Sequence, residues 1–139
     1  MSHCIRHLKD LPEETFGASW PGVIVKRVIH PKLVGSKNLS VNILKILPGY
    51  GTPNHIHYKS EEAWGVLEGE GIMRLNDKDY LFGVGDVLYV PAGVAHQVVC
   101  RGKDILRYFA ITAPPIDLER DNIILEPYNE ALFRDYMLK

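Results

Sequence analysis

The sequence predicts an all-β domain, a sandwich or barrel built from short strands. Two observations support this: segments rich in apolar and β-branched residues recur at close spacing, and Gly or Pro turns separate them. At 139 residues the chain is long enough for a single domain with its own hydrophobic core, and no repeat or low-complexity tract divides it. Helices are expected only at the periphery.

The chain begins with a predicted arm and two predicted strands. Residues 1–22 form the N-terminal arm, which ends in a Pro-Gly pair. β-branched residues then predict a strand over Val23–Ile29, and His30-Pro31 ends it. A second strand is predicted over Leu39–Leu47, with another Pro-Gly pair after it.

Six further strands are predicted in the central region, each separated from the next by turn residues. The stretch Asn76-Asp77-Lys78-Asp79 has the residue chemistry of a hairpin turn. The predicted strands are Ala63–Leu67, Ile72–Leu75, Tyr80–Phe82, Val87–Val90, Ala95–Cys100 and Ile105–Ile111.

The C-terminal region predicts one edge strand and one helix. Ile123–Leu125 is a short apolar run suited to the edge of a sheet. Asn129 has the residue type of an N-cap, and the spacing of the apolar residues after it predicts a short helix over 129–137. We expect this helix to pack outside the sheets.

Composition excludes several functional classes. The formal net charge is −1 and the Lys and Arg residues are scattered, which argues against a nucleic-acid surface. No apolar run approaches the ~20 residues of a membrane span, and the charged N-terminus does not resemble a signal peptide. The two cysteines, Cys4 and Cys100, have no metal-binding or disulfide-framework spacing. A cytoplasmic location is therefore expected.

The candidate functional residues are histidines and a carboxylate in the middle of the sequence. His55 and His57 are two residues apart, so an extended backbone directs both side chains to the same face. Glu62 follows, and His96 is a further candidate beyond a Gly/Pro-rich turn. Imidazole nitrogens with a carboxylate suit a divalent transition metal better than Mg or Ca, which prefer oxygen ligands.

Here the sequence resembles the cupin superfamily, whose barrels carry two motifs. The first has Gly, five residues, His-x-His, three or four residues, Glu, six residues and Gly; the second has Gly, five residues, Pro-x-Gly, two residues, His, three residues and Asn. The first motif matches over residues 49–69, at Gly49, His55, His57, Glu62 and Gly69. The second matches over residues 85–100, at Gly85, Pro91, Gly93 and His96, with Cys100 in place of the Asn, which is not a metal ligand.

The resemblance implies a jelly-roll barrel of two antiparallel sheets with one divalent metal inside it. Its ligands would be His55, His57, Glu62 and His96. Fe, Mn, Ni, Zn, Co and Cu are not distinguished by this ligand set. Two coordination positions would stay open for water, dioxygen or a chelating substrate, and the positive site would favour an anionic or enolisable ligand.

An ordinary explanation exists for each part of this pattern. A single His-x-His is usually a surface coincidence, and Glu61-Glu62 could be a solvated pair. Glu61 also fits the looser spacing of the first motif, whereas only Glu62 fits the six-residue count to Gly69. The agreement of four positions across two motifs favours the metal site.

Weaker expectations concern the residues around the site. Trp64 and Val66 share strand parity with Glu62 and should face the barrel interior, and Cys100 shares parity with His96. Polar-tipped residues that could reach a pocket, although a surface or core position is the more common outcome, are Tyr50, Tyr58, Tyr89, Arg107 and Tyr108. The remaining histidines, His3, His7 and His30, are expected to be exposed.

The resemblance covers many chemistries, among them dioxygenases, sugar and sugar-phosphate isomerases, decarboxylases and epimerases. It therefore implies a small-molecule enzyme of the dioxygenase or sugar/sugar-phosphate isomerase type, with a non-catalytic small-ligand-binding protein as the alternative. Neither the catalytic residues nor the substrate follow from the motifs. Single-domain cupins commonly pair through sheet edges and N-terminal arms, so a homodimer is expected.

Overall fold

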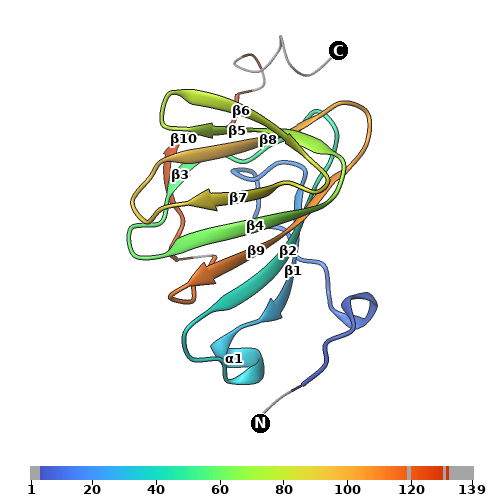
Figure 1. The fold of residues 1–139 in the computed structure, drawn as a ribbon, viewed down its shortest axis with the longest axis vertical. Helices are drawn as coiled ribbons and strands as arrows, with labels where there is room; N and C mark the ends of the chain where they lie inside the picture. Colours follow the sequence, from blue (N-terminus) through green and yellow to red (C-terminus); the bar gives the residue numbers. More distant parts are fainter. Residues whose placement is uncertain (1–3, 119, 130, 132–139) are drawn as a thin grey trace.

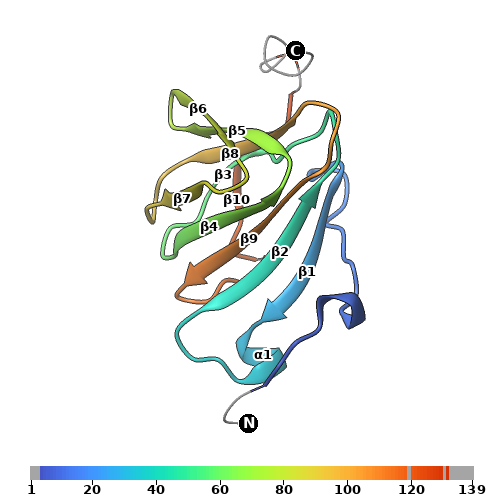
Figure 2. The same cartoon turned by 45° about the vertical axis from the view of Figure 1, so that its right-hand side comes forward.

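The computed structural model describes residues 4–118, 120–129 and 131, and it confirms the predicted all-β fold of two antiparallel sheets. Figures 1 and 2 show the two sheets facing each other. Sheet A has the strand order β1-β2-β9-β4-β7, and sheet B has the order β10-β3-β8-β5-β6. The strands are β1 (Val23–Ile29), β2 (Ser40–Ile46), β3 (Asn54–Ile56), β4 (Glu61–Glu68), β5 (Glu70–Leu75), β6 (Lys78–Gly83), β7 (Val87–Val90), β8 (His96–Arg101), β9 (Leu106–Ala113) and β10 (Ile123–Glu126).

Every strand predicted from the sequence is present, and β3 is the strand that the sequence reasoning did not delimit. It has three residues, too few for an alternating pattern to show, and it is held from both sides by pairing with β10 and β8. The predicted edge position of β10 is confirmed, because β10 lies at the end of sheet B.

The expectation that His30 is exposed was wrong. His30 is buried, and its Nδ1 accepts a hydrogen bond of 3.1 Å from the backbone N–H of Lys32, which caps the short helix α1 (Pro31–Val34). The sequence signals for this helix were a proline at its first position and Gly35 at its end, where φ is 74°. A second short element, the 3₁₀ helix η1 (Leu8–Asp10), lies in the N-terminal arm.

The hydrophobic core lies between the two sheets and follows strand alternation. In β9 buried and half-buried residues alternate, so that Leu106, Tyr108 and Ala110 face inward. Cys100 is fully buried in the same core, as its parity with His96 predicted. Burial raises the pKa of its thiol, which is the condition of an inert core cysteine.

The N-terminal arm packs against the barrel. The backbone N–H and C=O of Glu14 pair with Val25 of β1 through two hydrogen bonds of 2.8 Å. Phe16 and Trp20 then pack against the core between the sheets. The arm therefore adds two side chains to the interior of the barrel. They lie at the end of the barrel where polar as well as apolar side chains line the interior.

The predicted C-terminal helix falls largely outside the described residues, because residues 130 and 132–137 belong to it. At its start, Oδ1 of Asn129 accepts a hydrogen bond of 3.0 Å from the backbone N–H of Ala131, the kind of contact that an N-cap residue makes. None of the helices in the described part of the chain is long and apolar enough to cross a membrane.

Candidate metal centre

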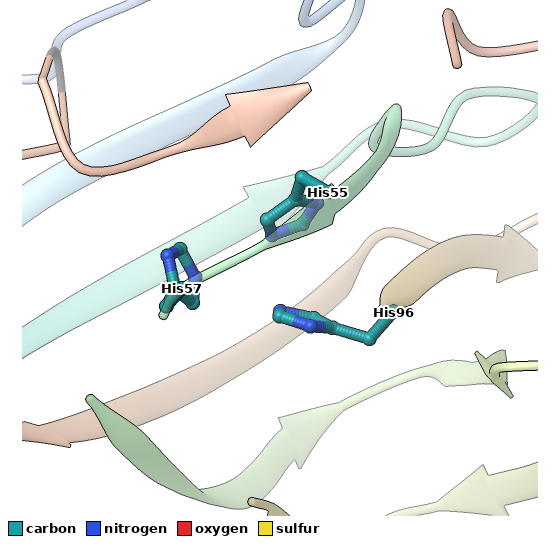
Figure 3. Close-up of side chains that lie close together, drawn as sticks. All are labelled: His55, His57 and His96. Atoms are coloured by element: carbon teal, nitrogen blue, oxygen red, sulfur yellow. The ribbon is translucent and has the colours of Figure 1, made fainter. Parts of the chain in front are cut away.

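Three histidines converge between the sheets. His55 lies in β3, His57 follows that strand directly, and His96 is the first residue of β8. The backbone register places His96 opposite His55, so the second histidine motif is brought back to the first as predicted. Figure 3 shows the three rings turned toward a common space, and one ring nitrogen from each lies within 4.8 Å of the others.

Each ring is held by a hydrogen bond from Nδ1 to a backbone carbonyl. The acceptors are the carbonyls of Pro53 for His55 at 2.8 Å, of Asp121 for His57 at 3.2 Å and of Val94 for His96 at 3.0 Å. Because a carbonyl only accepts, Nδ1 must carry the proton, and in a neutral ring Nε2 keeps its lone pair. Hydrogen bonds of this kind orient imidazoles that ligate metals.

Glu62 reaches the same space from the opposite sheet. Its Oε2 lies 3.2 Å from Nε2 of His96 and its Oε1 lies 3.5 Å from Nε2 of His57. Oε2 of Glu62 and Nε2 of His96 are both buried without an aligned hydrogen-bond partner among the described residues. Glu61 is exposed, with its carboxylate 3.4 Å from the Tyr89 hydroxyl, so Glu62 is the member of the pair that faces the histidines.

This arrangement fits a bound cation. A carboxylate oxygen and an unprotonated imidazole nitrogen are both acceptors, and two acceptors face each other favourably only with a proton or a cation between them. The three buried histidine nitrogens lie close enough together to hold a metal ion, and the Glu62 carboxylate lies beside two of them.

The electrostatics of the cluster agree with this interpretation. Burial, reinforced by His96 and His57, lowers the pKa of His55 well below its ordinary value. Burial also lowers the pKa of His57, against the opposing effect of the Glu62 carboxylate. Burial would raise the pKa of Glu62, but the adjacent His96 and His57 favour the ionised carboxylate and lower this pKa. Neutral imidazoles beside an ionised carboxylate are the forms that bind metal.

A small cavity adjoins the cluster. Its volume is ≈ 30 Å³, far below the ~300–1,000 Å³ of pockets for drug-sized ligands. Most of its walls are apolar, with a few polar side chains besides the cluster, and no Lys or Arg is among its described lining residues. The residues outside the cluster that line it include Phe16, Trp20, Asn42, Trp64, Tyr108, Ile116, Leu118 and Asn122.

Two of the weaker expectations are confirmed at this cavity. Trp64 and Val66 are buried on the inner face of β4, and Trp64 also lines the cavity. Its ring stacks on Tyr108 with ring centroids 4.4 Å apart. Burial and the nearby Glu62 carboxylate raise the pKa of Tyr108 well above its ordinary range, so this hydroxyl stays protonated and can donate.

Other candidates do not reach the cavity. Tyr50, Tyr58 and Tyr89 are exposed, and Arg107 is half-buried on the outer face of sheet A beside Glu68. His7 is exposed as predicted, and His3 lies outside the described residues.

Sequence reasoning missed the residues that complete the cavity from the arm and from the loop after β9. Trp20 packs its ring edge-on against His55, with ring centroids 4.9 Å apart, and Asn122 lines the cavity from the loop. Neither residue lies in a periodic segment, so strand parity could not place it. The one available signal was a pair of aromatic residues in an otherwise polar arm.

The sequence matches the family described as cupin domain over residues 42–112, about half of the chain. That range contains all four candidate ligands. The chain belongs to the cupin family. An uncharacterised protein of Methanocaldococcus jannaschii is 31% identical to this cupin over 105 residues, which cover 76% of this chain and 83% of that protein.

Two further similarities involve proteins named for oxalate. The oxalate-binding protein of Thermotoga maritima is 31% identical over 68 residues, covering 49% of this cupin and 56% of that protein. The structure of Lactobacillus farciminis oxalate decarboxylase in complex with formate superposes with a TM-score of 0.73 at 25% identity. The superposition covers 86% of this cupin and 35% of the decarboxylase chain.

Proposed function

We propose that this cupin is a metal-dependent enzyme acting on a small chelating molecule, with His55, His57, Glu62 and His96 as the metal ligands. The observation that carries the proposal is the buried meeting of three oriented imidazoles and one carboxylate, in which facing acceptor atoms lack hydrogen-bond partners. A divalent metal bound there would act as a Lewis acid for the ligand oxygens and would leave positions open for them.

The cavity favours a dioxygenase-type reaction, with dioxygen as co-substrate, over an isomerase. An isomerase has to move a proton between carbon atoms and needs a general base. Among the described lining residues Glu62 is the one carboxylate, and it is committed to the metal in this proposal. A sugar phosphate would also bring a phosphate into a cavity whose described walls offer it no Lys or Arg.

The alternative is a cupin that holds a small ligand on the metal without turnover. The same scarcity of acid and base groups supports it, and so does the similarity to a protein named for oxalate binding. Both versions predict a small ligand that is anionic or enolisable, because one carboxylate leaves a divalent ion with net positive charge.

Oxygen consumption distinguishes a dioxygenase from a protein that binds its ligand without turnover. The protein would be loaded anaerobically with Fe²⁺ and mixed with 2,4-pentanedione or lactate, and dioxygen uptake would be recorded together with loss of the organic compound; the binding of oxalate would be measured in parallel. A dioxygenase consumes one dioxygen per molecule lost, and Glu62→Gln abolishes the uptake because it removes the charged ligand.

The His7→Ala variant is the matched control, since His7 is exposed and outside the cluster. Binding of one of these compounds without dioxygen uptake, for protein loaded with Fe²⁺, Mn²⁺ or Ni²⁺ in turn, would support the non-catalytic alternative. A sugar phosphate that isomerises at the same metal would contradict the dioxygenase assignment.

A cytoplasmic location and a homodimer complete the proposal. Cys4 and Cys100 are not joined in a disulfide, as expected in a reducing compartment. The outer face of sheet A carries apolar side chains among its charged ones, which supports pairing of two copies.

A further inference from the structure

A polar side chain of sheet A lies at the wall of the cavity. Asn42 is on the inner face of β2 and is only 4% exposed, yet its amide makes no hydrogen bond with any described residue. It lines the cavity beside the metal cluster. An amide at the wall of a cavity can form hydrogen bonds with whatever occupies that cavity, either water or a ligand.

The backbone register places Asn42 close to the cluster. It pairs with Ala110 of β9, which pairs in turn with Trp64 of β4, so these three residues form one row across sheet A. The neighbouring row contains Glu62. Alternation directs Asn42 to the same side as Trp64 and Glu62, toward the space that the histidines share.

We propose that Asn42 is the ligand-recognition residue of this cupin and that its amide hydrogen-bonds an oxygen of the metal-bound ligand. The inference rests on the proposed function, because it assumes that the cavity holds a ligand of the metal. A neutral amide offers both an acceptor and donors, so it suits a hydroxyl adjacent to a carbonyl or carboxylate. The ligand class is therefore a small 2-hydroxy acid or hydroxyketone.

Size and charge in the cavity agree with this class. The cavity is small, and its mostly apolar walls match a short carbon skeleton. With no Lys or Arg among the described walls, the metal is the charged partner for a carboxylate. Asn42 then contributes selectivity for the hydroxyl, since a hydroxyl without a partner would lose its hydrogen bonds to water.

The test compares two ligands that differ in one group. Lactate and isobutyrate have the same shape, with a hydroxyl in one and a methyl in the other. Their affinities would be measured by calorimetry for the Ni²⁺-loaded protein and for its Asn42→Leu variant. We expect the preference for lactate to fall about three- to tenfold in the variant, the size of one hydrogen bond. Coordination of the hydroxyl by Ni²⁺ contributes equally to the lactate affinity of both proteins, so it cancels when their preferences are compared.

Two accompanying measurements exclude a structural role. Asn42→Leu should keep the nickel stoichiometry and the melting temperature, because the amide makes no hydrogen bond with a described residue that the substitution would break. Asn38→Leu, in an exposed loop, is the control and should change neither preference nor stoichiometry. An unchanged lactate preference in Asn42→Leu, no lactate binding to the wild type, or a large fall in its melting temperature would overturn the inference. Intact nickel binding in that case leaves the proposed metal centre standing.

Discussion

A hydrogen bond from Nδ1 to a backbone carbonyl fixes the tautomer of each cluster histidine. His55 is the most informative, because burial and the adjacent His96 and His57 hold its pKa well below its ordinary value. In the unfolded chain His55 takes up a proton near pH 6.5, whereas in the metal-free folded chain it does so only at lower pH. The unfolded state therefore binds more protons in this window, and the free energy of unfolding falls as the pH drops.

Melting temperatures of the metal-free protein between pH 7.5 and 5.0 would test this. We expect the melting temperature to fall across the range, and the fall to be smaller in His55→Gln, which has no titrating group at this position. His7→Gln should retain the wild-type slope, since His7 is exposed. Protonation of Glu62 also lowers the free energy of unfolding, but at a lower pH than protonation of His55, because the pKa of Glu62 lies below the usual 4.5. A melting temperature that stays constant or rises on acidification would contradict the account.

At the scale of elements, the turns of the two motifs shape the barrel. All four motif glycines, Gly49, Gly69, Gly85 and Gly93, have positive φ. At Gly69, between β4 and β5, φ is 76° and a Cβ would lie 2.3 Å from the carbonyl oxygen of Ile105. Gly69→Ala therefore meets both an unfavourable backbone conformation and a clash with rigid main chain.

We expect Gly69→Ala to lower the free energy of unfolding by about 2–4 kcal/mol, measured by denaturant titration. Gly49→Ala has the same unfavourable φ but open space around its Cβ, and should cost only about 1–2 kcal/mol. Gly83→Ala, with an ordinary 3.7 Å neighbour, should be close to neutral. Equal costs for all three variants would show that the close approach at Gly69 has no energetic consequence.

Strand periodicity accounts for what the sequence could predict at this scale. Long strands such as β1 and β9 are rich in apolar and β-branched residues and lie between turn residues, and that composition is visible without a structure. The three residues of β3 carry no such pattern, and His30 was misjudged because its role is local, as the cap of a helix one turn long. Spacing between motif residues, by contrast, identified the four residues that meet at the cavity.

The remaining cavity residues depend on tertiary packing of irregular segments. Trp20 lies in the arm. Asn122 lies in the loop whose Asp121 carbonyl accepts the hydrogen bond from His57. No pattern in the sequence connects these segments to the histidines. Asn42 lies in a predicted strand, and what the sequence could not reveal is that its side chain lines the cavity.

At the scale of the whole molecule, part of the outer face of sheet A is apolar, beside charged residues such as Arg107 and Lys45. Ile43, Phe109 and Ile111 lie on it half-buried, and the side chains of Val87 and Tyr89 extend it toward β7 with exposures of 79% and 56%. Contiguous apolar surface of this kind favours association, and two copies could bury it in an isologous interface.

We therefore expect a homodimer, with a scattering mass twice the 15.7 kDa of one chain at micromolar concentration. Ile111→Glu should give monomers, because each interface would then bury two unpaired carboxylates. Leu81→Glu, on an exposed residue of sheet B, is the control and should remain dimeric. A wild-type mass of a single chain would overturn the prediction.

Metal stoichiometry tests most directly whether the three histidines and Glu62 form one metal site. The wild type, His57→Ala, Glu62→Gln and His7→Ala would each be stripped, reloaded with one divalent metal and analysed by elemental analysis and by competition with a chelator. The account predicts one metal per chain for the wild type and His7→Ala, with affinity at least tenfold weaker in the other two, since each loses a ligand. Unchanged stoichiometry and affinity in His57→Ala and Glu62→Gln would contradict it.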